Sequence, residues 1–407
     1  MEKKRRIHPA WIILFGMTLV QGGFIGVGIN CISVLFAGIT ENMGFASSKL
    51  SLYYTIRGLI SASLVAPAVS LFMKKKNAKM IAVMGFLVGI SLCLMSLYNH
   101  VWQWYISAAI NALGACMGPM MVPMVINAWF HKKRGLATGI AMSASGIFGA
   151  LLSPACGGII ESLGWRAAAV FMGVCLMALT MIPSLLFIRI TPEQMGCRAY
   201  GADEEKPENE QPREIPGEKK YSVSSFAMMG FAMLVFTVIT QFAFLIPTYS
   251  RVLGYATMVG ATLTSIAMIG NIGFKLIFGA AVDRFGVHRT TIATLILGAG
   301  AFCLLMMGSR SALFLYAGSF LFGSLYSLGT IASSLLCISV FGRDYQKPMS
   351  RISAVTQVAA AFATPFYSFV YEASASFVPV LVGCAVACLL PTGVLVVLAA
   401  QSRRQNG

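Results

Sequence analysis

Charged residues are scarce in this sequence, and acidic ones are the scarcest. Only 11% of the 407 residues are charged, whereas 57% are hydrophobic. Soluble globular proteins carry about 25% charged residues. The composition therefore excludes an ordinary soluble protein and is typical of a chain that crosses a membrane several times.

The motifs of well-known enzyme sites are also missing. The 10 cysteines include no C-x-x-C pair, so we expect them to be small apolar packing residues, not disulfides or metal ligands. No H-E-x-x-H, G-x-S-x-G or G-x-x-x-x-G-K-[ST] pattern occurs. These absences argue against a metalloprotease, a serine hydrolase and an ATP-driven pump. We expect a protein that is not an enzyme and that needs no cofactor.

What the sequence does contain is a series of long apolar runs. Each is about 20 residues or longer, which is the length that a helix needs to cross the hydrocarbon core of a bilayer. The runs cover residues 9–38, 48–73, 79–98, 101–128, 135–160, 166–188, 222–248, 257–282, 289–308, 311–341, 349–371 and 376–400. They predict an all-α membrane protein with twelve transmembrane helices. The first run follows a basic segment, as in a signal peptide, but no cleavage site of small residues comes soon after it, so we interpret it as a retained helix.

A polar segment divides the predicted spans into two sets of six. Residues 191–221 are rich in Glu, Pro and Gly and poor in apolar side chains, which predicts a solvated linker. The expected domains are an N-terminal six-helix bundle over residues 1–190, this linker, and a C-terminal bundle over residues 222–407. Lys and Arg gather at both termini, in the linker and in the loops on that same side. The positive-inside rule therefore predicts a multi-pass protein of the plasma (inner) membrane with both termini in the cytoplasm.

The two halves of the sequence repeat each other. At one constant offset in residue number, the matching pairs are Gly118 with Gly329, Phe130 with Phe341, Pro154 with Pro365, and Glu161 with Glu372. Such a repeat implies two bundles of the same orientation, related by a pseudo-two-fold axis along the membrane normal. A substrate pathway is then expected between the bundles, near the midplane of the membrane.

Several motifs resemble those of the major facilitator superfamily. "GAAVDRFGVHR" (279–289) is similar to the G-x-x-x-D-R-x-G-x-R loop of that family, and "GALLSPACGG" (149–158) is similar to a helix-5 pattern associated with exchangers. "WFHKKRGLATGI" (129–140) with "GWR" (164–166) resembles the branch of monocarboxylate transporters and oxalate/formate antiporters. The resemblance implies the major facilitator fold and secondary transport. It assigns gating or structural roles to Asp283, Arg284, Arg289, Pro154, Gly157 and Gly158.

The same branch places an arginine in helix 8, four residues before a glycine and eight before the acidic loop position. Lys275 stands at that place in this chain and is followed by Gly279 and Asp283. Monocarboxylate transporters have an Asp one turn before the arginine, where this chain has Asn271. The resemblance thus implies an anion ligand at Lys275, with no carboxylate beside it to carry a proton.

Counting charges leads to the same residue. Two cations, Arg57 and Lys275, lie within the apolar runs, whereas none of the 14 acidic residues lies at mid-membrane depth. A lone cation at the bilayer centre costs about 2.5–3.5 kcal/mol on insertion scales, and an anionic substrate would supply the missing counter-charge. The alternatives are that either side chain extends to the nearest aqueous surface or that Lys275 pairs with Asp283. Further polar residues could line a substrate path or form interhelical hydrogen bonds: Asn271, Gln21, Asn30, Gln241, Tyr326 and Gln357.

These patterns favour a secondary transporter of a small organic anion, a mono- or dicarboxylate, that works by alternating access. Because no acid lies at mid-membrane depth, exchange for another anion is slightly favoured, and proton symport stays open if the substrate's own carboxyl carries the proton. The expected partners are the substrate, a proton or counter-anion, and the lipid bilayer, with no nucleic acid, and we expect a monomer. Two alternatives stay open: an exporter of drugs or hydrophobic metabolites, and a membrane sensor that transports nothing.

Overall fold

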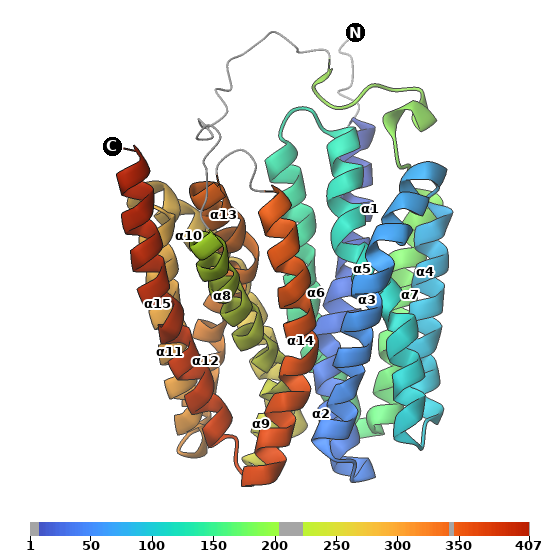
Figure 1. The fold of residues 1–407 in the computed structure, drawn as a ribbon. Helices are drawn as coiled ribbons and strands as arrows, with labels where there is room; N and C mark the ends of the chain where they lie inside the picture. Colours follow the sequence, from blue (N-terminus) through green and yellow to red (C-terminus); the bar gives the residue numbers. More distant parts are fainter. Residues whose placement is uncertain (1–7, 203–222, 342–345, 407) are drawn as a thin grey trace. The chain divides into compact units, whose positions relative to one another are not determined.

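The computed structural model describes residues 8–202, 223–341 and 346–406 (Figure 1). The described chain is helical, and an isolated β-bridge joins Phe130 to Tyr200. Helices are the expected solution for apolar segments in lipid, because a helix satisfies its own backbone hydrogen bonds.

The first half of the chain begins with α1 (Pro9–Gln21), which continues without a break through the π-helix η1 (Gly22–Cys31) into α2 (Ile32–Met43). The His8 imidazole accepts a hydrogen bond from the main-chain nitrogen of Ala10 and so caps the start of α1. The following elements are α3 (Ser47–Lys75), α4 (Lys79–Leu94) with η2 (Met95–Leu97), α5 (Val101–Trp129), α6 (Arg134–Leu163), α7 (Trp165–Leu186) and η3 (Pro192–Met195).

The second half begins with α8 (Val223–Thr240), η5 (Gln241–Leu245) and α9 (Ile246–Val252), which form one continuous segment. Then come α10 (Thr257–Phe285), α11 (Val287–Met306) with η6 (Met307–Ser309), and α12 (Ala312–Phe322) with η7 (Gly323–Leu325), η8 (Leu328–Ala332) and α13 (Ser333–Phe341). The last elements are α14 (Gln346–Ser374) and α15 (Val378–Asn406). Gly164 and Gly286, which separate α6 from α7 and α10 from α11, have φ values of 85° and 82°, a conformation that favours glycine.

Every predicted span has a helical counterpart at nearly the same bounds. Within the described residues, nine helices are long and apolar enough to cross a membrane. Three others, α3, α5 and α14, have 29 residues each. The all-α membrane class is confirmed, and the total of twelve spans stays a prediction. Pro154 and Pro365, a matched pair of the predicted repeat, lie inside α6 and α14 respectively, and the repeat itself stays a prediction.

The described residues divide into two compact units. One lies within Met1–Leu35 and Ile60–Glu210, and the other lies within Phe36–Leu59 and Gln211–Gly407. The dividing points fall inside α2 and α3, so that the end of α2 and the beginning of α3 belong to the second unit. The predicted bundles 1–190 and 222–407 and the linker 191–221 remain predictions, because residues 203–222 lie outside the described part of the chain.

Small residues allow the helices of the first unit to approach one another closely. Along α4 and α7, which lie side by side in Figure 1, a methyl group added at Gly89 would stand 2.9 Å from the main-chain oxygen of Gly173. Between η1 and α6, the Asn30 amide donates a hydrogen bond of 3.1 Å to the main-chain oxygen of Ser145. Close backbone approach of this kind is a usual source of helix association in membranes.

The second unit has a continuous core that α8, α11, α12, α14 and α15 share. Its aromatic members include Phe242 and Phe302, whose ring centroids are 5.7 Å apart. Two buried tyrosines direct their hydroxyls to main-chain oxygens of neighbouring helices, Tyr249 to Leu305 at 2.7 Å and Tyr367 to Val238 at 3.0 Å. The polar ends of these side chains are thereby satisfied inside the apolar core.

Hydroxyl groups join the beginning of α3 to α14 within this second unit. The Glu372 carboxylate accepts hydrogen bonds from the Ser48 main-chain nitrogen at 2.7 Å and from the Ser48 hydroxyl at 2.6 Å. The Ser51 and Ser368 hydroxyls are 2.8 Å apart. An acid at a helix N-terminus satisfies unpaired N–H groups and interacts favourably with the helix dipole. Glu372 therefore caps α3 from a helix that is distant in the sequence.

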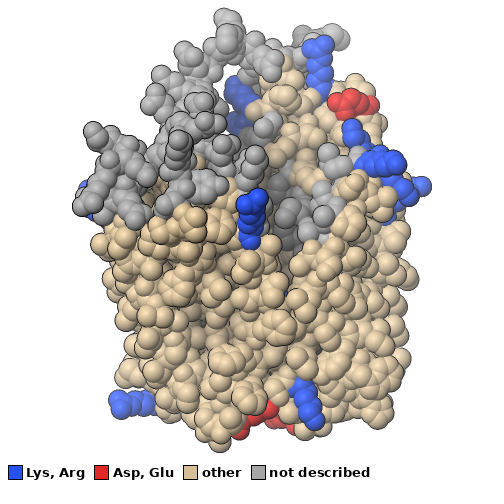
Figure 2. Space-filling model, in the orientation of Figure 1, with Lys and Arg blue, Asp and Glu red and all other residues tan. Residues whose placement is uncertain are grey.

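Charged side chains are scarce across the middle of the face shown in Figure 2. On the face shown in Figure 2, Lys, Arg, Asp and Glu lie mostly toward the two ends, and a broad band between them is formed by other residues. Large apolar side chains are exposed along the helices, for example Leu276 at 73% and Leu151 at 66%. Both features are expected of a surface that faces lipid.

Gly270 lies where α10 crosses α12, and we expect its replacement by alanine to destabilise the protein by about 1–3 kcal/mol. A methyl group there would overlap the main-chain oxygen of Phe320, which cannot move without shifting its helix. Gly273→Ala, one turn further along α10, is the matched control, because a methyl group at Gly273 has no neighbour within 4 Å. Thermal unfolding in detergent should show a lower melting temperature for Gly270→Ala alone. Equal melting temperatures would contradict the packing described for this crossing.

Candidate functional site

Lys275 lies in the second half of α10 and is partly buried. Of the side chains that the structure describes, none forms a hydrogen bond or an ion pair with its ammonium group. The side chain of Asp283, the predicted alternative partner, lies outside the described set. Lys275 thus remains a cation without a described counter-charge inside an apolar helix.

Asn271 lies one turn before Lys275 and is 7% exposed. Its Oδ1 atom is enclosed and receives no hydrogen bond from the described residues. The neighbouring chain is close at this point, since a methyl group on Gly323 would stand 2.5 Å from the main-chain nitrogen of Asn271. The Ser324 hydroxyl, next to Gly323, is also enclosed and has no described partner. Asn271 and Ser324 thus each carry a polar atom without a described partner where α10 approaches the end of α12, and a buried polar atom without a partner costs free energy.

Arg57 is the second cation, and the structure encloses it more completely. It lies in α3, is 8% exposed, and its Nη1 atom is buried with no acceptor among the described residues. Its guanidinium carbon is 5.3 Å from the ring centroid of Tyr54 and 5.6 Å from that of Phe244. The two rings stack on each other with a centroid distance of 4.6 Å. Cation–π contacts of this kind contribute about 0.5–2 kcal/mol each, but they supply no hydrogen-bond acceptor.

Tyr54 adds a further donor beside Arg57. It is 5% exposed, and its hydroxyl is buried without a described hydrogen-bond partner. Guanidinium N–H groups and a phenol O–H can donate together to one carboxylate, which accepts about four hydrogen bonds. Glu41 forms an ion pair with Arg251 and so does not serve as the counter-charge of Arg57 or Lys275.

The other predicted polar residues occupy several environments. Gln21, at the end of α1, is 2% exposed; its amide nitrogen contacts the Met142 sulfur at 3.5 Å and its Oε1 has no described donor. Asn30 is held by the main-chain oxygen of Ser145. Gln241 begins η5 and is partly buried, Tyr326 packs its ring against Phe322, and Gln357 is exposed on α14. Lys275, Asn271, Arg57, Gln241, Tyr326 and Gln357 all belong to the second compact unit, and Gln21 and Asn30 belong to the first.

The predicted gating residues lie at the end of α10, the start of α11 and in α6. Arg284 and Arg289 are exposed, and the Arg284 guanidinium lies 5.3 Å from the Phe285 ring centroid. Pro154, Gly157 and Gly158 lie inside α6. The neighbouring Ser153 hydroxyl is 3.5 Å from the sulfur of Cys31 in η1, so this stretch of α6 packs against the π-helix. Their role in gating stays a prediction.

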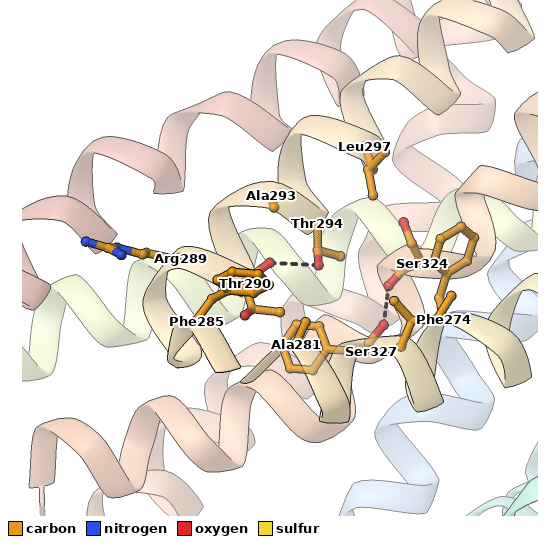
Figure 3. A pocket seen from close by; sticks show the side chains of 12 residues that line it. Phe274, Ala281, Phe285, Arg289, Thr290, Ala293, Thr294, Leu297, Ser324 and Ser327 are labelled. Atoms are coloured by element: carbon orange, nitrogen blue, oxygen red, sulfur yellow. Dashed lines mark hydrogen bonds between the residues drawn. The ribbon is translucent and has the colours of Figure 1, made fainter. Parts of the chain in front are cut away.

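A cavity of about 370 Å³ lies between α10, α11 and the turn that follows α12 (Figure 3). Its walls are mainly apolar, as at Phe274. Two of its hydroxyls are already bonded, Thr294 to the main-chain oxygen of Thr290 at 2.9 Å and Ser327 to that of Ser324 at 2.5 Å. Arg289 lies at its edge and points away from its centre in Figure 3. Lys275 does not line this cavity. The cavity is therefore suited to an apolar group and is not a site for an anion.

Sequence reasoning missed the aromatic surroundings of Arg57. Tyr54 stands three residues before Arg57 and shares its face of α3, which is a signal that could have been used. Phe244 comes from η5 in the other half of the chain, and nothing local in the sequence indicates the contact. Among the described residues, no group of His, Cys, Asp and Glu side chains is placed to hold a metal ion.

Comparison with known proteins agrees with this architecture. The family model described as Major Facilitator Superfamily matches residues 18–274. "Probable transporter MCH2" of Saccharomyces cerevisiae is 23% identical over 68% of this chain and 57% of its own length. "Monocarboxylate transporter 4" of Rattus norvegicus is 24% identical over 68% of this chain and 56% of its own. "Monocarboxylate transporter 12-B" of Danio rerio is 25% identical over 84% of this chain and 78% of its own length.

The chain thus spans just over half the length of the first two of these relatives. Among solved structures, the D-xylose–proton symporter superposes with a TM-score of 0.70 at 16% identity, covering 94% of this chain and 97% of its own. The nucleoside transporter NupG gives a TM-score of 0.66 at 12% identity, covering 98% and 99%. At such identities the structures support the fold alone.

Proposed function

The chain belongs to the Major Facilitator Superfamily, and from that premise we propose that it is a secondary transporter of a small organic anion. The substrate is a mono- or dicarboxylate. It moves by alternating access, in which two six-helix bundles expose a central site to one side of the membrane and then to the other.

One observation carries the proposal: two cations, Lys275 and Arg57, lie in apolar helices without a described carboxylate partner. Each cation in a span costs about 2.5–3.5 kcal/mol on insertion scales. A bound anion would turn that cost into binding free energy, because hydrogen bonds to charged groups are about twice as strong as neutral ones. The Tyr54 hydroxyl beside Arg57 provides a further donor for a carboxylate, and the Asn271 amide lies one turn from Lys275.

The names of the relatives point to the same substrate class. Three of the matching proteins are monocarboxylate transporters of rat, zebrafish and chicken by name. Those names describe the relatives, and the carboxylate is taken over to this chain as part of the proposal. It agrees with the two cations described above, which lie in apolar helices without a described carboxylate partner.

Exchange against a second anion is the proposed coupling mode. Anion uptake against an inside-negative membrane potential costs about 2.3 kcal/mol per charge per 100 mV. Asn271 occupies the position beside Lys275 at which a carboxylate could have carried a proton, so the chain offers no proton carrier there. Exchange of one anion for another removes the electrical cost without a proton. We further propose a monomer in the plasma (inner) membrane with both termini in the cytoplasm.

Counterflow in proteoliposomes tests the substrate class. Vesicles containing the full chain are loaded with unlabelled lactate, formate or oxalate and diluted into the labelled acid. We expect transient accumulation of label that depends on the acid inside, and no comparable movement of a cationic dye. If no carboxylate moves while a cationic dye is exported, the proposal is wrong and the drug-exporter alternative is supported.

A further inference from the structure

A second, basic cavity lies in the first compact unit, where α3 ends, α4 begins and α7 ends. Its volume is about 420 Å³, and its lining includes the four cations Lys75, Lys76, Lys79 and Arg189. None of the four makes an ion pair with a described side chain. The proposed transport site does not use this cavity: its lining belongs to the first compact unit, whereas Lys275 and Arg57 belong to the second.

Hydrogen bonds hold the turn between α3 and α4, which carries Lys76 and is flanked by Lys75 and Lys79. The Gln194 amide donates to the main-chain oxygen of Lys76 at 2.8 Å, and its Oε1 accepts from the Ile190 nitrogen at 2.9 Å. Asn77 caps α4 by accepting from the Lys79 nitrogen at 2.9 Å. Lys76 itself has a φ of 43°, a conformation uncommon for a residue with a side chain. The main chain at Lys76 and Lys79 is therefore held in place beside the cavity that these cations line.

The charge of the cavity is positive even when its acidic neighbour is counted. The Thr191 hydroxyl and the Glu193 main-chain N–H, with a smaller contribution from Lys76, hold the pKa of the Glu193 carboxyl below its usual range. Glu193 is therefore ionised at neutral pH. One carboxylate against four cations leaves a site that favours a negatively charged group.

Apolar surface continues directly from the charged cavity. Leu185 lines the cavity and is 50% exposed, and the next residues, Leu186 and Phe187, are 62% and 40% exposed. α7 ends at Leu186, so cations and exposed apolar side chains meet where a spanning helix ends. A soluble oxyanion would use only the cations, whereas a lipid would use both surfaces.

We propose that this basic cavity binds the phosphate headgroup of an anionic phospholipid, with an acyl chain lying against Leu185, Leu186 and Phe187. Basic pockets at the cytoplasmic ends of spanning helices are suited to anionic headgroups, and each Lys or Arg near the membrane surface contributes a favourable electrostatic interaction. The inference concerns lipid, not the transported substrate, and holds whichever substrate the protein carries.

Lipid titration of the purified full chain tests the inference, with native mass spectrometry as the readout. Phosphatidylglycerol is expected to bind, while phosphatidylcholine and glycerol 3-phosphate do not bind in the same range. Arg189→Gln and Lys76→Gln should each weaken phosphatidylglycerol binding about fivefold, and Arg189→Lys should retain most of it. Lys74→Gln is the matched control, because Lys74 is exposed in the same basic run but does not line the cavity.

Three results would overturn the inference. If Lys74→Gln weakens lipid binding as much as Arg189→Gln, the effect is diffuse surface charge and not this cavity. If glycerol 3-phosphate binds as tightly as phosphatidylglycerol, the occupant is a soluble phosphate. If phosphatidylglycerol binding is unchanged in Arg189→Gln and Lys76→Gln, with melting temperatures also unchanged, the lipid lies elsewhere.

Discussion

Replacement of Lys275 by glutamine is expected to reduce carboxylate exchange about 100-fold or more, with the protein still folded. Glutamine has a similar length and can still donate a hydrogen bond, but it carries no charge. A hydrogen bond to a charged group contributes about 1.5–3 kcal/mol, and the attraction between opposite charges is stronger where water is excluded. Folding should not suffer, because Lys275 has no hydrogen bond or ion pair with a described side chain that the change would break.

Initial rates of counterflow at several substrate concentrations measure this effect. Lys275→Arg keeps the charge and should retain a substantial part of the exchange. Arg310→Gln removes one exposed positive charge from the same unit and is expected to leave exchange unchanged. Full exchange by a well-expressed Lys275→Gln protein would remove Lys275 from the site and leave the fold and family as they are.

Much of the fold follows from local sequence pattern. An apolar run longer than the thickness of the hydrocarbon core must satisfy its backbone within itself, and so α4 and α10 begin and end close to their predicted bounds. The glycine of "DRFG", Gly286, separates α10 from α11 with a positive φ, as a glycine between two helices can. The continuous helix from Pro9 to Met43 extends beyond its predicted end at residue 38, and in this extension the Thr40 hydroxyl and the Asn42 amide donate to main-chain oxygens one turn earlier.

The candidate site is less predictable, because its contacts join distant parts of the chain. Composition and depth identify Lys275 and Arg57 as cations within spans. Composition and depth do not show whether the side chain of such a cation is enclosed by the protein or extends to the aqueous surface. The structure resolves this for Arg57, which Tyr54 and Phe244 enclose. Gln357 and Asn271 are both polar residues within predicted spans, yet Gln357 is exposed whereas Asn271 is buried, because the rotation of a helix about its axis depends on its neighbours.

Arg57 with Tyr54 is the second pair whose alteration should have a large effect on transport. Arg57→Gln removes the charge from a side chain that is 8% exposed and whose Nη1 atom has no described acceptor. If a substrate carboxylate is the missing acceptor, exchange should fall about 10- to 100-fold. Tyr54→Phe removes only the hydroxyl and keeps the ring that stacks on Phe244, so a smaller loss of about 3- to 10-fold is expected, in apparent affinity more than in maximal rate.

A tyrosine whose hydroxyl already has a partner separates ligand binding from folding. Tyr367→Phe deletes a hydroxyl that donates to the main-chain oxygen of Val238, so it should lower the melting temperature and leave the apparent affinity for the carboxylate unchanged. Tyr54→Phe should do the reverse, because its hydroxyl has no described partner in the ligand-free protein and contributes little to the stability of the fold. Should Tyr54→Phe and Arg57→Gln alter stability but not affinity, the stacked rings and the cation between α3 and η5 serve packing alone. Binding of the anion would then depend on Lys275 and Asn271, which lie in α10 and not in α3 or η5.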